Sequence, residues 1–341
     1  MTIYSHDYMK KVLADAHDGR YALPAINISN LDTAIAAMDG LQVAGSPGFV
    51  QVSIGAAEQA SPDGDPVKGS LILGRMLAEL RKQYDVPIFI HTDHCHVQNV
   101  DRWLRPLLVE LKRLKDESGE RIFDSFMFDG SMAEIHENAK IIDELVPLVK
   151  AVDGFIEVEA GGAWGGSEDG VGGGAKYSTP EDVKVIQNAM HANGYDDGDY
   201  LLAVAFGNAH GTAVVPNLKP ELLHEIAVNT NADNLFVFHG GSGSPDGDVE
   251  AAVANGVVKM NVDTDTQYAF TQGVADFLES APMVEDGNDE DGDGHPVIIA
   301  YKSHEHGKQW FDPRHWNHAG RASMSAHVGD VAKLLGSIGH A

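Results

Sequence analysis

Eight short apolar runs divide the chain, and each ends in a polar or charged residue of a catalytic type. The polar ends of the runs are Asn27, Ser53, Asp93 with His94, Asp129, Glu159, His210, His239 and Asp263. They recur at intervals of roughly 25 to 50 residues with helical patterns between them, which is typical of an eightfold (β/α)8 TIM barrel. Runs rich in Val, Ile and Phe suit strands buried on both faces. In such a barrel the eight ends converge on the face where catalytic residues lie.

The intervals between the runs carry helix start signals. Ser131 with Glu134 matches a capping box. Thr179, Pro180 and Asp182 supply an N-cap, a first helical residue and an acid in the first turn. We therefore expect strand, loop and helix to repeat along the chain.

Acidic side chains dominate the composition. The 51 Asp and Glu residues against 24 Lys and Arg give a formal net charge of -27. This charge repels phosphate backbones and anionic membranes, so we expect neither nucleic acid nor membrane partners. Repulsion among the acids is screened where the Debye length falls to about 3 Å near 1 M salt, which favours a halophilic protein. Asp286–Gly294 loosely resembles a calcium loop but lacks the required glycine and glutamate, so we interpret it as a solvated acidic loop.

The single cysteine, Cys95, excludes an internal disulfide, and the N-terminal residues show no apolar core of signal-peptide length. We expect a cytoplasmic protein. Nothing around Cys95 activates it as a nucleophile, which favours a packed thiol. No Ser/Pro-rich linker interrupts the chain, so residues 1–341 are expected to form a single barrel domain with a C-terminal helical extension.

One interval is unusually rich in glycine. The segment AGGAWGGSEDGVGGGAKYS follows Glu159 and precedes the helix expected at Thr179. Glycine gives a backbone wide conformational freedom. We expect a lid over the barrel mouth that carries Glu168 and Asp169, with a plain surface connection as the alternative.

Three histidines end three different runs: His94, His210 and His239. Three neutral imidazoles with open positions left for substrate are the arrangement of a catalytic zinc. The prediction depends on all three lying on one rim, since a lone histidine at a strand end is more often a hydrogen-bonded polar residue. Asp93, next to a presumed ligand, is placed to move protons as a general acid or base.

His91 and His96 lie close to this group in sequence, but strand alternation does not direct the whole HTDHCH run at one point, so we interpret both as structural. After the last two runs, FHGGSGS and NVDTDTQ supply glycine amides and the hydroxyls of Ser242 and Thr264 where barrels hold phosphate. These features predict an anionic sugar phosphate as the substrate.

In order along the chain, ALPAIN, HTDHC, EDGV, FGNAHG, VFHGGSGS, VVKMNVDTDTQ and DPRHW resemble motifs of the class II, metal-dependent fructose-bisphosphate aldolases. The likeness covers about Tyr21 to Met324. It implies zinc or a related divalent ion on the three histidines, which would polarise the substrate carbonyl. It also implies Asp93 as proton donor and acceptor beside the scissile bond, Glu168 as the lid base, and Asn261 at the enediolate.

The resemblance also implies a phosphate site and a dimer. It places the ketone-side phosphate on Gly211, Gly240, Ser242 and Thr264. It places the rest of the sugar and its second phosphate on Asn27, Ser53, Asp263 and Arg314. Ser167 stands where the family often has a first lid glutamate, which leaves a second metal position on Asp129 and Glu159 open. The family's lysine after FGNAHG is absent, which suggests amides or a monovalent cation near the phosphate. A homodimer is implied by resemblance alone.

The activity implied is cleavage of fructose 1,6-bisphosphate into dihydroxyacetone phosphate and glyceraldehyde 3-phosphate. Three alternatives stay open. Tagatose-bisphosphate aldolases share the scaffold. A Schiff-base mechanism could use Lys259, which should face the same side of its strand as Asn261 but leaves the histidines unexplained. A phosphosugar-binding barrel without catalysis is the third, and Asp93 and Glu168 argue against it.

Overall fold

A closed barrel of eight parallel strands, in the order β1 to β8, forms the centre of the protein. The computed structural model describes residues 4–160, 177–208, 217–231, 234–285, 297–304 and 307–341. The strands are β1 (Leu23–Asn27), β2 (Gly48–Val52), β3 (Ile88–His96), β4 (Ser125–Asp129), β5 (Phe155–Ala160), β6 (Tyr200–Val204), β7 (Leu235–Phe238) and β8 (Val257–Val262). All eight coincide with the apolar runs, so the predicted (β/α)8 TIM barrel is confirmed.

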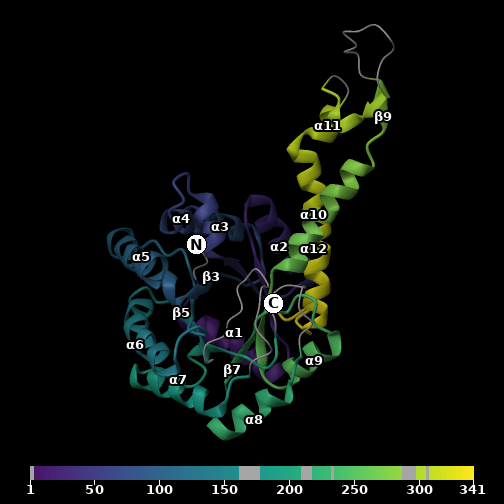
Figure 1. The fold of residues 1–341 in the computed structure, drawn as a ribbon. Coiled ribbons are helices and arrows are strands. Elements are labelled where there is room, and N and C mark those ends of the chain that lie inside the picture. Colours follow the sequence, from purple (N-terminus) through teal and green to yellow (C-terminus); the bar gives the residue numbers. More distant parts are fainter. Residues whose placement is uncertain (1–3, 161–176, 209–216, 232–233, 286–296, 305–306) are drawn as a thin grey trace.

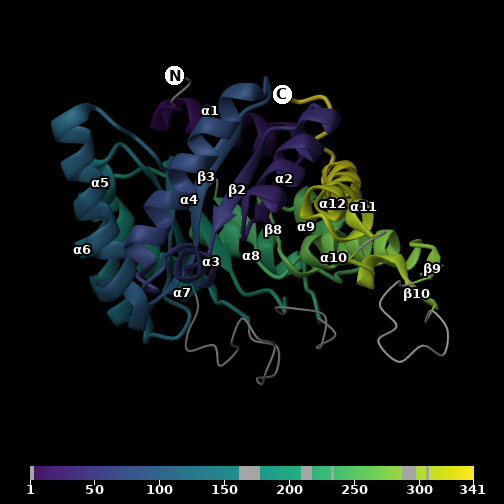
Figure 2. The same ribbon diagram turned by 90° about the horizontal axis from the view of Figure 1, so that it is seen from above.

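Helices surround the barrel (Figures 1 and 2). Those from the first half of the chain are α1 (His6–Gly19), α2 (Leu31–Ala44), α3 (Ile54–Ala60), α4 (Pro66–Leu80), α5 (Arg105–Ser118) and α6 (Ile135–Ala151). Those from the second half are α7 (Pro180–Ala192), α8 (Glu221–Thr230), α9 (Asp246–Ala254), α10 (Thr264–Glu279), α11 (Lys308–Phe311) and α12 (Pro313–Leu334). Short 3₁₀ or π turns span Arg81–Gln83, Val97–Asn99, Val100–Leu104 and Ala300–Lys302.

The two predicted helix starts have different outcomes. At α7 the predicted N-cap at Thr179 is confirmed, and the structure adds a capping box there: the Thr179 hydroxyl accepts from the Asp182 backbone N–H, and the Asp182 carboxylate accepts from the Thr179 backbone N–H. The box at Ser131 is wrong. Helix α6 begins at Ile135 with Glu134 as an N-cap that makes no side-chain bond. The Ser131 hydroxyl donates instead to Asp129 at 2.5 Å, which holds the turn after β4.

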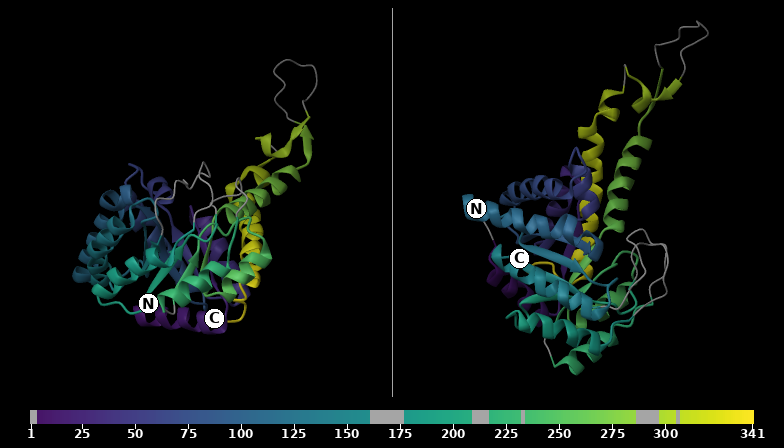
Figure 3. Two further views of the ribbon diagram at one scale, coloured as in Figure 1. Left: turned by 60° about the horizontal axis from the view of Figure 1, so that its bottom comes forward. Right: turned by 60° about the vertical axis from the view of Figure 1, so that its left-hand side comes forward.

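Helix α1 closes the end of the barrel where the strands begin. Its buried residues Met9 and Leu13 form one apolar cluster with strand residues, among them Phe49, Phe89, Phe155 and Leu201. A second apolar cluster fills the layer between the strands and the outer helices. Both chain termini lie at the α1 end (Figure 3). The open end of the barrel is therefore the carboxyl end of the strands.

Strand β3 is irregular at its end. Its pairing with β4 shifts register between Thr92 and Cys95, and His94 has a left-handed φ of 31°. Regular alternation would place the side chains of Asp93 and His94 on opposite faces. The bulge lets both neighbours lie at the barrel mouth, where they are 3 % and 5 % exposed.

The chain after β8 builds an arm that projects from the barrel (Figures 1 and 3). Helix α10 runs outward, an antiparallel pair of β9 (Met283–Glu285) and β10 (Val297–Ile299) follows, and α12 returns beside α10. The inner part of α12 packs on α2. Helix α11 and the beginning of α12 thus lie on the outer part of the arm.

Candidate metal centre and active site

The barrel interior changes from apolar to polar towards the carboxyl ends of the strands. Above the aromatic side chains lie buried polar side chains from four strands: Gln51, His91, Glu157 and Lys259. The next positions facing inward, closer to the mouth, carry Asn27, Asp93, Glu159 and Asn261. Residues two apart in a strand share a face, which explains why both sets point inward.

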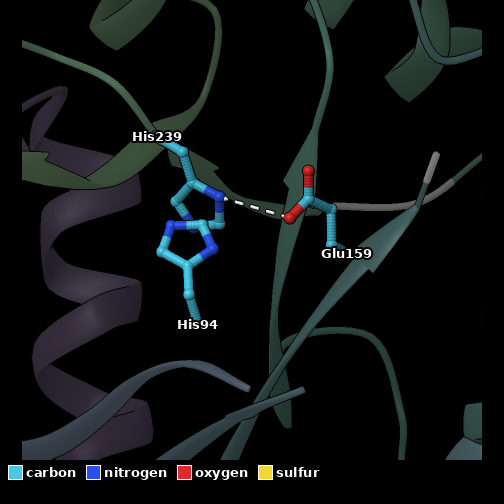
Figure 4. A group of neighbouring side chains, drawn as sticks. All are labelled: His94, Glu159 and His239. Atoms are coloured by element: carbon cyan, nitrogen blue, oxygen red, sulfur yellow. Dashed lines mark ion pairs between the residues drawn. The ribbon is translucent and has the colours of Figure 1, made fainter. Parts of the chain in front are cut away.

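Two histidines and a glutamate form a group suited to a metal ion. His94, Glu159 and His239 each offer a ligand atom within 4.8 Å of the others, and all three are buried. Figure 4 shows the two imidazoles next to each other, in an edge-to-face arrangement with ring centroids 4.4 Å apart, and the Glu159 carboxylate beside His239. His239 Nδ1 lies 3.5 Å from Glu159 Oε2. Two imidazoles and a carboxylate are ligands that zinc and similar divalent ions accept, so these residues fit such an ion.

The charges around this group favour a cation. Burial lowers the pKa of His94, but Asp93, Asp129 and Glu159 together raise it well above its ordinary value. Burial and the nearby Asp129 raise the pKa of Glu159. Carboxylates thus outnumber cations at the barrel mouth, and a divalent ion would offset their repulsion.

Asp93 sits between two amides. Its Oδ2 accepts from Asn27 Nδ2 at 2.7 Å, and its Oδ1 accepts from Asn261 Nδ2 at 3.1 Å. Asn27 is oriented in turn, because its Oδ1 accepts from Gln51 Nε2 at 2.7 Å. Burial raises the pKa of Asp93, but His94, Lys259 and the Asn27 bond outweigh it and the pKa is lowered. Asp93 is therefore a fixed, ionised carboxylate that can accept a proton.

Asp129 lies behind His94. Its Oδ2 accepts from His94 Nδ1 at 3.0 Å and contacts His96 Nδ1 at 2.8 Å. Burial opposes ionisation of Asp129, but the two histidines hold its pKa well below the usual range. A carboxylate bonded to one ring nitrogen orients the other nitrogen of an imidazole. In this structure Asp129 thus orients the imidazole of His94, while Glu159 is itself one of the candidate metal ligands.

Glu157 belongs to the buried polar layer, although no motif in the sequence marks it as a site residue. It accepts from His239 Nε2 at 2.7 Å and pairs with Lys259 at 2.8 Å. The alternation in FIEVE was the available signal, because Glu157 shares a face with Glu159. Lys259 donates to Asn261 Oδ1 at 2.6 Å, which confirms that these two residues face the same side of β8. His91 Nδ1 lies 2.7 Å from Ser125 Oγ, and Cys95 is buried as expected of a packed thiol.

The loops after β7 and β8 are joined to each other. Ser242 Oγ accepts from the backbone N–H of Asp265 at 3.3 Å, and the Gly243 N–H donates to the Asp265 carboxylate at 3.0 Å. Gly240 has a φ of 68°, which glycine adopts without strain. Thr264 begins α10 directly after Asp263. The candidate phosphate-binding residues of these two loops are thus close together at the barrel mouth.

Other predicted site residues lie apart or outside the described residues. Ser53 follows β2 and caps α3 by accepting from the Ala56 N–H at 3.3 Å. Arg314 lies in the first turn of α12, on the outer part of the arm, where its side chain is 81 % exposed and pairs with Asp312 at 2.6 Å. His210, Gly211, the segment with Ser167, Glu168 and Asp169, and the acidic loop Asp286–Gly294 lie outside the described residues.

Comparison with known proteins agrees with this geometry. The family model described as "Fructose-bisphosphate aldolase class-II" matches residues 7–340. The fructose-bisphosphate aldolase of Streptomyces galbus is 36% identical over 353 residues, with 100% of this chain and 99% of that protein covered. The fructose-bisphosphate aldolase of Mycobacterium tuberculosis is 36% identical over 344 residues, with 96% and 95% covered.

A solved structure extends the likeness to the fold. The crystal structure of fructose-bisphosphate aldolase from Campylobacter jejuni superposes with a TM-score of 0.81 at 29% identity, and covers 98% of this chain and 96% of that chain. The match thus spans the barrel, its mouth and the arm. With its family match, its relatives and its histidine and carboxylate cluster, the chain belongs to the class II fructose-bisphosphate aldolases, a family of metal-dependent carbon–carbon lyases.

Proposed function

We propose that the protein catalyses the reversible aldol cleavage of fructose 1,6-bisphosphate into dihydroxyacetone phosphate and glyceraldehyde 3-phosphate. One observation carries the proposal: in a chain of this family, the group of His94, Glu159 and His239 lies beside the ionised Asp93 at the barrel mouth. The named relatives are fructose-bisphosphate aldolases, so tagatose 1,6-bisphosphate is not favoured as substrate.

The metal is proposed to be zinc, or a related divalent ion, held by His94, His239 and His210. When bound, the ion supplies Lewis-acid polarisation of the substrate carbonyl. Glu159 and Asp129 are proposed for a second position, supported by the place of Glu159 beside His239. A monovalent cation near the phosphate is proposed because the segment after FGNAHG lacks a lysine.

Asp93 is proposed to remove the proton from the substrate hydroxyl beside the scissile bond. Its two oxygens each receive one amide hydrogen bond, which fixes the carboxylate and leaves lone pairs for the hydroxyl. Asn261 is proposed to donate to the enediolate as well as to Asp93. Glu168, on the glycine-rich segment, is proposed to return a proton to the ketone fragment.

The phosphates are proposed to bind at two places. Gly211, Gly240, Ser242 and Thr264 would hold the ketone-side phosphate with backbone amides and hydroxyls. The rest of the sugar and its second phosphate would meet Asn27, Ser53, Asp263 and Arg314. The joined loops after β7 and β8 support the first group.

A homodimer is proposed because the Arg314 side chain, in the first turn of α12, is 81 % exposed on its own chain. It would meet substrate if the arm of one protomer reached the barrel mouth of another. Mixing Asp93→Asn with Arg314→Ala protein after subunit exchange should restore activity at roughly a quarter of the sites, since a two-fold dimer then combines one intact Asp93 with one intact Arg314. No recovery would contradict the exchange of arms.

The chain is proposed to act as one catalytic domain with α12 as its C-terminal extension. Among the described residues no helix is both long and apolar enough to span a bilayer. A cytoplasmic location is proposed.

Metal removal tests the proposed function directly. Chelation should abolish cleavage of fructose 1,6-bisphosphate, and added zinc should restore it. Borohydride with substrate should have no effect, because no Schiff base forms on a lysine. Inactivation by borohydride together with indifference to chelator would favour Lys259 as the nucleophile, and preferred cleavage of tagatose 1,6-bisphosphate would reassign the substrate.

Two variants separate the proposed proton transfers. Asp93→Asn should lower cleavage at least about 100-fold while solvent exchange of the dihydroxyacetone phosphate proton continues. Glu168→Gln should lower that exchange by a similar factor and retain its metal. Exchange at the parent rate in Glu168→Gln would exclude Glu168 as the base and direct attention to Asp263 or Glu159.

A further inference from the structure

The polar layer beneath the active site contains an ion pair that solvent does not reach. Lys259 and Glu157 are both 0 % exposed, and Lys259 Nζ lies 2.8 Å from Glu157 Oε2. Removing two charges from water carries a large desolvation cost, and an apolar pair of the same size is often at least as stable. The other contacts of Lys259 and Glu157 indicate that the pair does more than stabilise the fold.

The first contact leads to Asp93. Lys259 Nζ donates to Asn261 Oδ1 at 2.6 Å. An ammonium group can only donate, so it holds the amide oxygen towards itself and turns the amide nitrogen away. That nitrogen donates to Asp93 Oδ1 at 3.1 Å. Without the ammonium, the amide of Asn261 could rotate and present its oxygen to the carboxylate.

The second contact leads to the candidate metal group. Glu157 Oε1 lies 2.7 Å from His239 Nε2. A carboxylate accepts only, so it favours the proton on Nε2 and directs Nδ1 towards the side of Glu159, 3.5 Å away. A metal-binding imidazole is commonly fixed by such a carboxylate at its other nitrogen. Lys259 Nζ, 2.8 Å from Glu157 Oε2, holds the carboxylate in place for that bond.

We propose that Lys259 is a positioning residue for both halves of the active site. Through Asn261 it orients the amide that holds Asp93, and through Glu157 it sets the tautomer of His239. The role through Asn261 rests on the proposed function, because that function assigns the proton transfer to Asp93. The role through Glu157 concerns the affinity of His239 and its neighbours for a metal ion, and it does not depend on the substrate.

The test uses the double variant Lys259→Met/Glu157→Gln, because changing either residue alone leaves a buried charge without its partner. Met cannot donate to Asn261, and the neutral amide of Gln can offer either its oxygen or its nitrogen to His239. Zinc affinity is measured by competition with a chromogenic chelator. We expect it to fall about 10- to 100-fold, and kcat at saturating zinc to fall by a similar factor with KM changed less than about threefold.

A matched control removes another buried ion pair. Arg81 and Asp124 are 2.5 Å apart, with side chains 4 % and 3 % exposed, near the beginnings of β3 and β4. The variant Arg81→Met/Asp124→Asn should melt at a lower temperature but keep parent zinc affinity and kcat. Equal thermal losses in the two variants, with zinc affinity and kcat unchanged in both, would give Lys259 only a structural role and overturn the proposal.

Partial results are also decisive. A fall in kcat without a fall in zinc affinity, or the reverse, would overturn the proposal, because a single residue is held to set both. If the parent protein does not cleave fructose 1,6-bisphosphate, the proposed function fails. The zinc affinities of the two double variants would then still decide whether the Lys259–Glu157 pair positions His239.

Discussion

Burial keeps one imidazole neutral inside the barrel. His91 is 0 % exposed, and burial, with the nearby Lys259 ammonium, lowers its pKa to about 3. In the unfolded chain a histidine titrates near 6.5. Between these two pKa values the unfolded state binds a proton that the folded state does not. The free energy of unfolding is therefore independent of His91 titration above about pH 6.5, and it decreases as the pH falls from about 6.5 towards 3.

Replacing His91 should therefore make the protein less sensitive to acid. We expect His91 to lower the free energy of unfolding by about 2 kcal/mol between pH 7 and pH 5. Denaturant unfolding of the parent and of His91→Gln, both at high salt, would measure this difference. An equal drop in both proteins between the two pH values would show that His91 titrates alike in the folded and unfolded states.

Among individual residues, the strand-end pattern located Asp93, His94, Glu159 and His239, because the end of a strand is visible in local sequence, whereas Asn261 was indicated only by the family resemblance. It could not show that His94 has a φ of 31°, since a bulge depends on the register with the next strand. The pairing of Lys259 with Glu157 was equally hidden, because it joins strands about 100 residues apart in sequence.

Among the elements, the close approach of α2 and α12 depends on a glycine. A Cβ atom added to Gly40 would lie 2.6 Å from Val328 Cβ and 2.7 Å from the backbone oxygen of Ser325. These distances are below ordinary van der Waals contact, so one helix would have to move. In contrast, a Cβ atom added to Gly329, on α12 itself, meets nothing within 4 Å.

These two glycines should respond in opposite directions to alanine. Gly40→Ala should destabilise the protein by about 1–3 kcal/mol through overpacking. Gly329→Ala should stabilise it by up to about 1 kcal/mol, because alanine restricts the unfolded chain and favours a helix. Melting curves of both variants under one condition provide the measurement, and a shift of the same sign in both would contradict the described α2–α12 contact.

A capping motif in the sequence does not by itself predict where a helix begins. Both Thr179 and Ser131 precede an acid at the spacing of a capping box, but only Thr179 caps a helix. Ser131 lies beside the buried carboxylate of Asp129, which offers its hydroxyl a charged acceptor. The sequence motif does not reveal that competition, because it depends on where β4 ends.

For the whole molecule, acidic charge is the dominant property. Several surface cations already have acidic partners: Arg113 lies between Glu110 and Glu117, and Arg105 between Asp101 and Glu144. The net charge of -27 therefore remains as excess carboxylates, whose repulsion opposes compact folding at low salt.

Salt should raise the melting temperature. Between about 0.1 M and 1 M the Debye length falls from about 10 Å to about 3 Å, which screens this repulsion. A thermal melt in KCl up to about 2 M is the measurement, and chloride is used throughout because sulfate strengthens apolar burial in any protein. A melting temperature independent of KCl concentration would exclude the halophilic interpretation.

Cys95 is the only thiol in the chain; it is 0 % exposed, and burial raises its pKa to about 12. Thiol-directed reagents attack thiolates, so they should leave this residue unmodified. A spin label can thus be attached at a newly introduced cysteine without first removing Cys95. With Tyr268→Cys, at an arm position that is 67 % exposed, a nitroxide would attach at one place per chain. Two such labels in a dimer would report the distance between the arms by dipolar spectroscopy, while a monomer would give no dipolar signal.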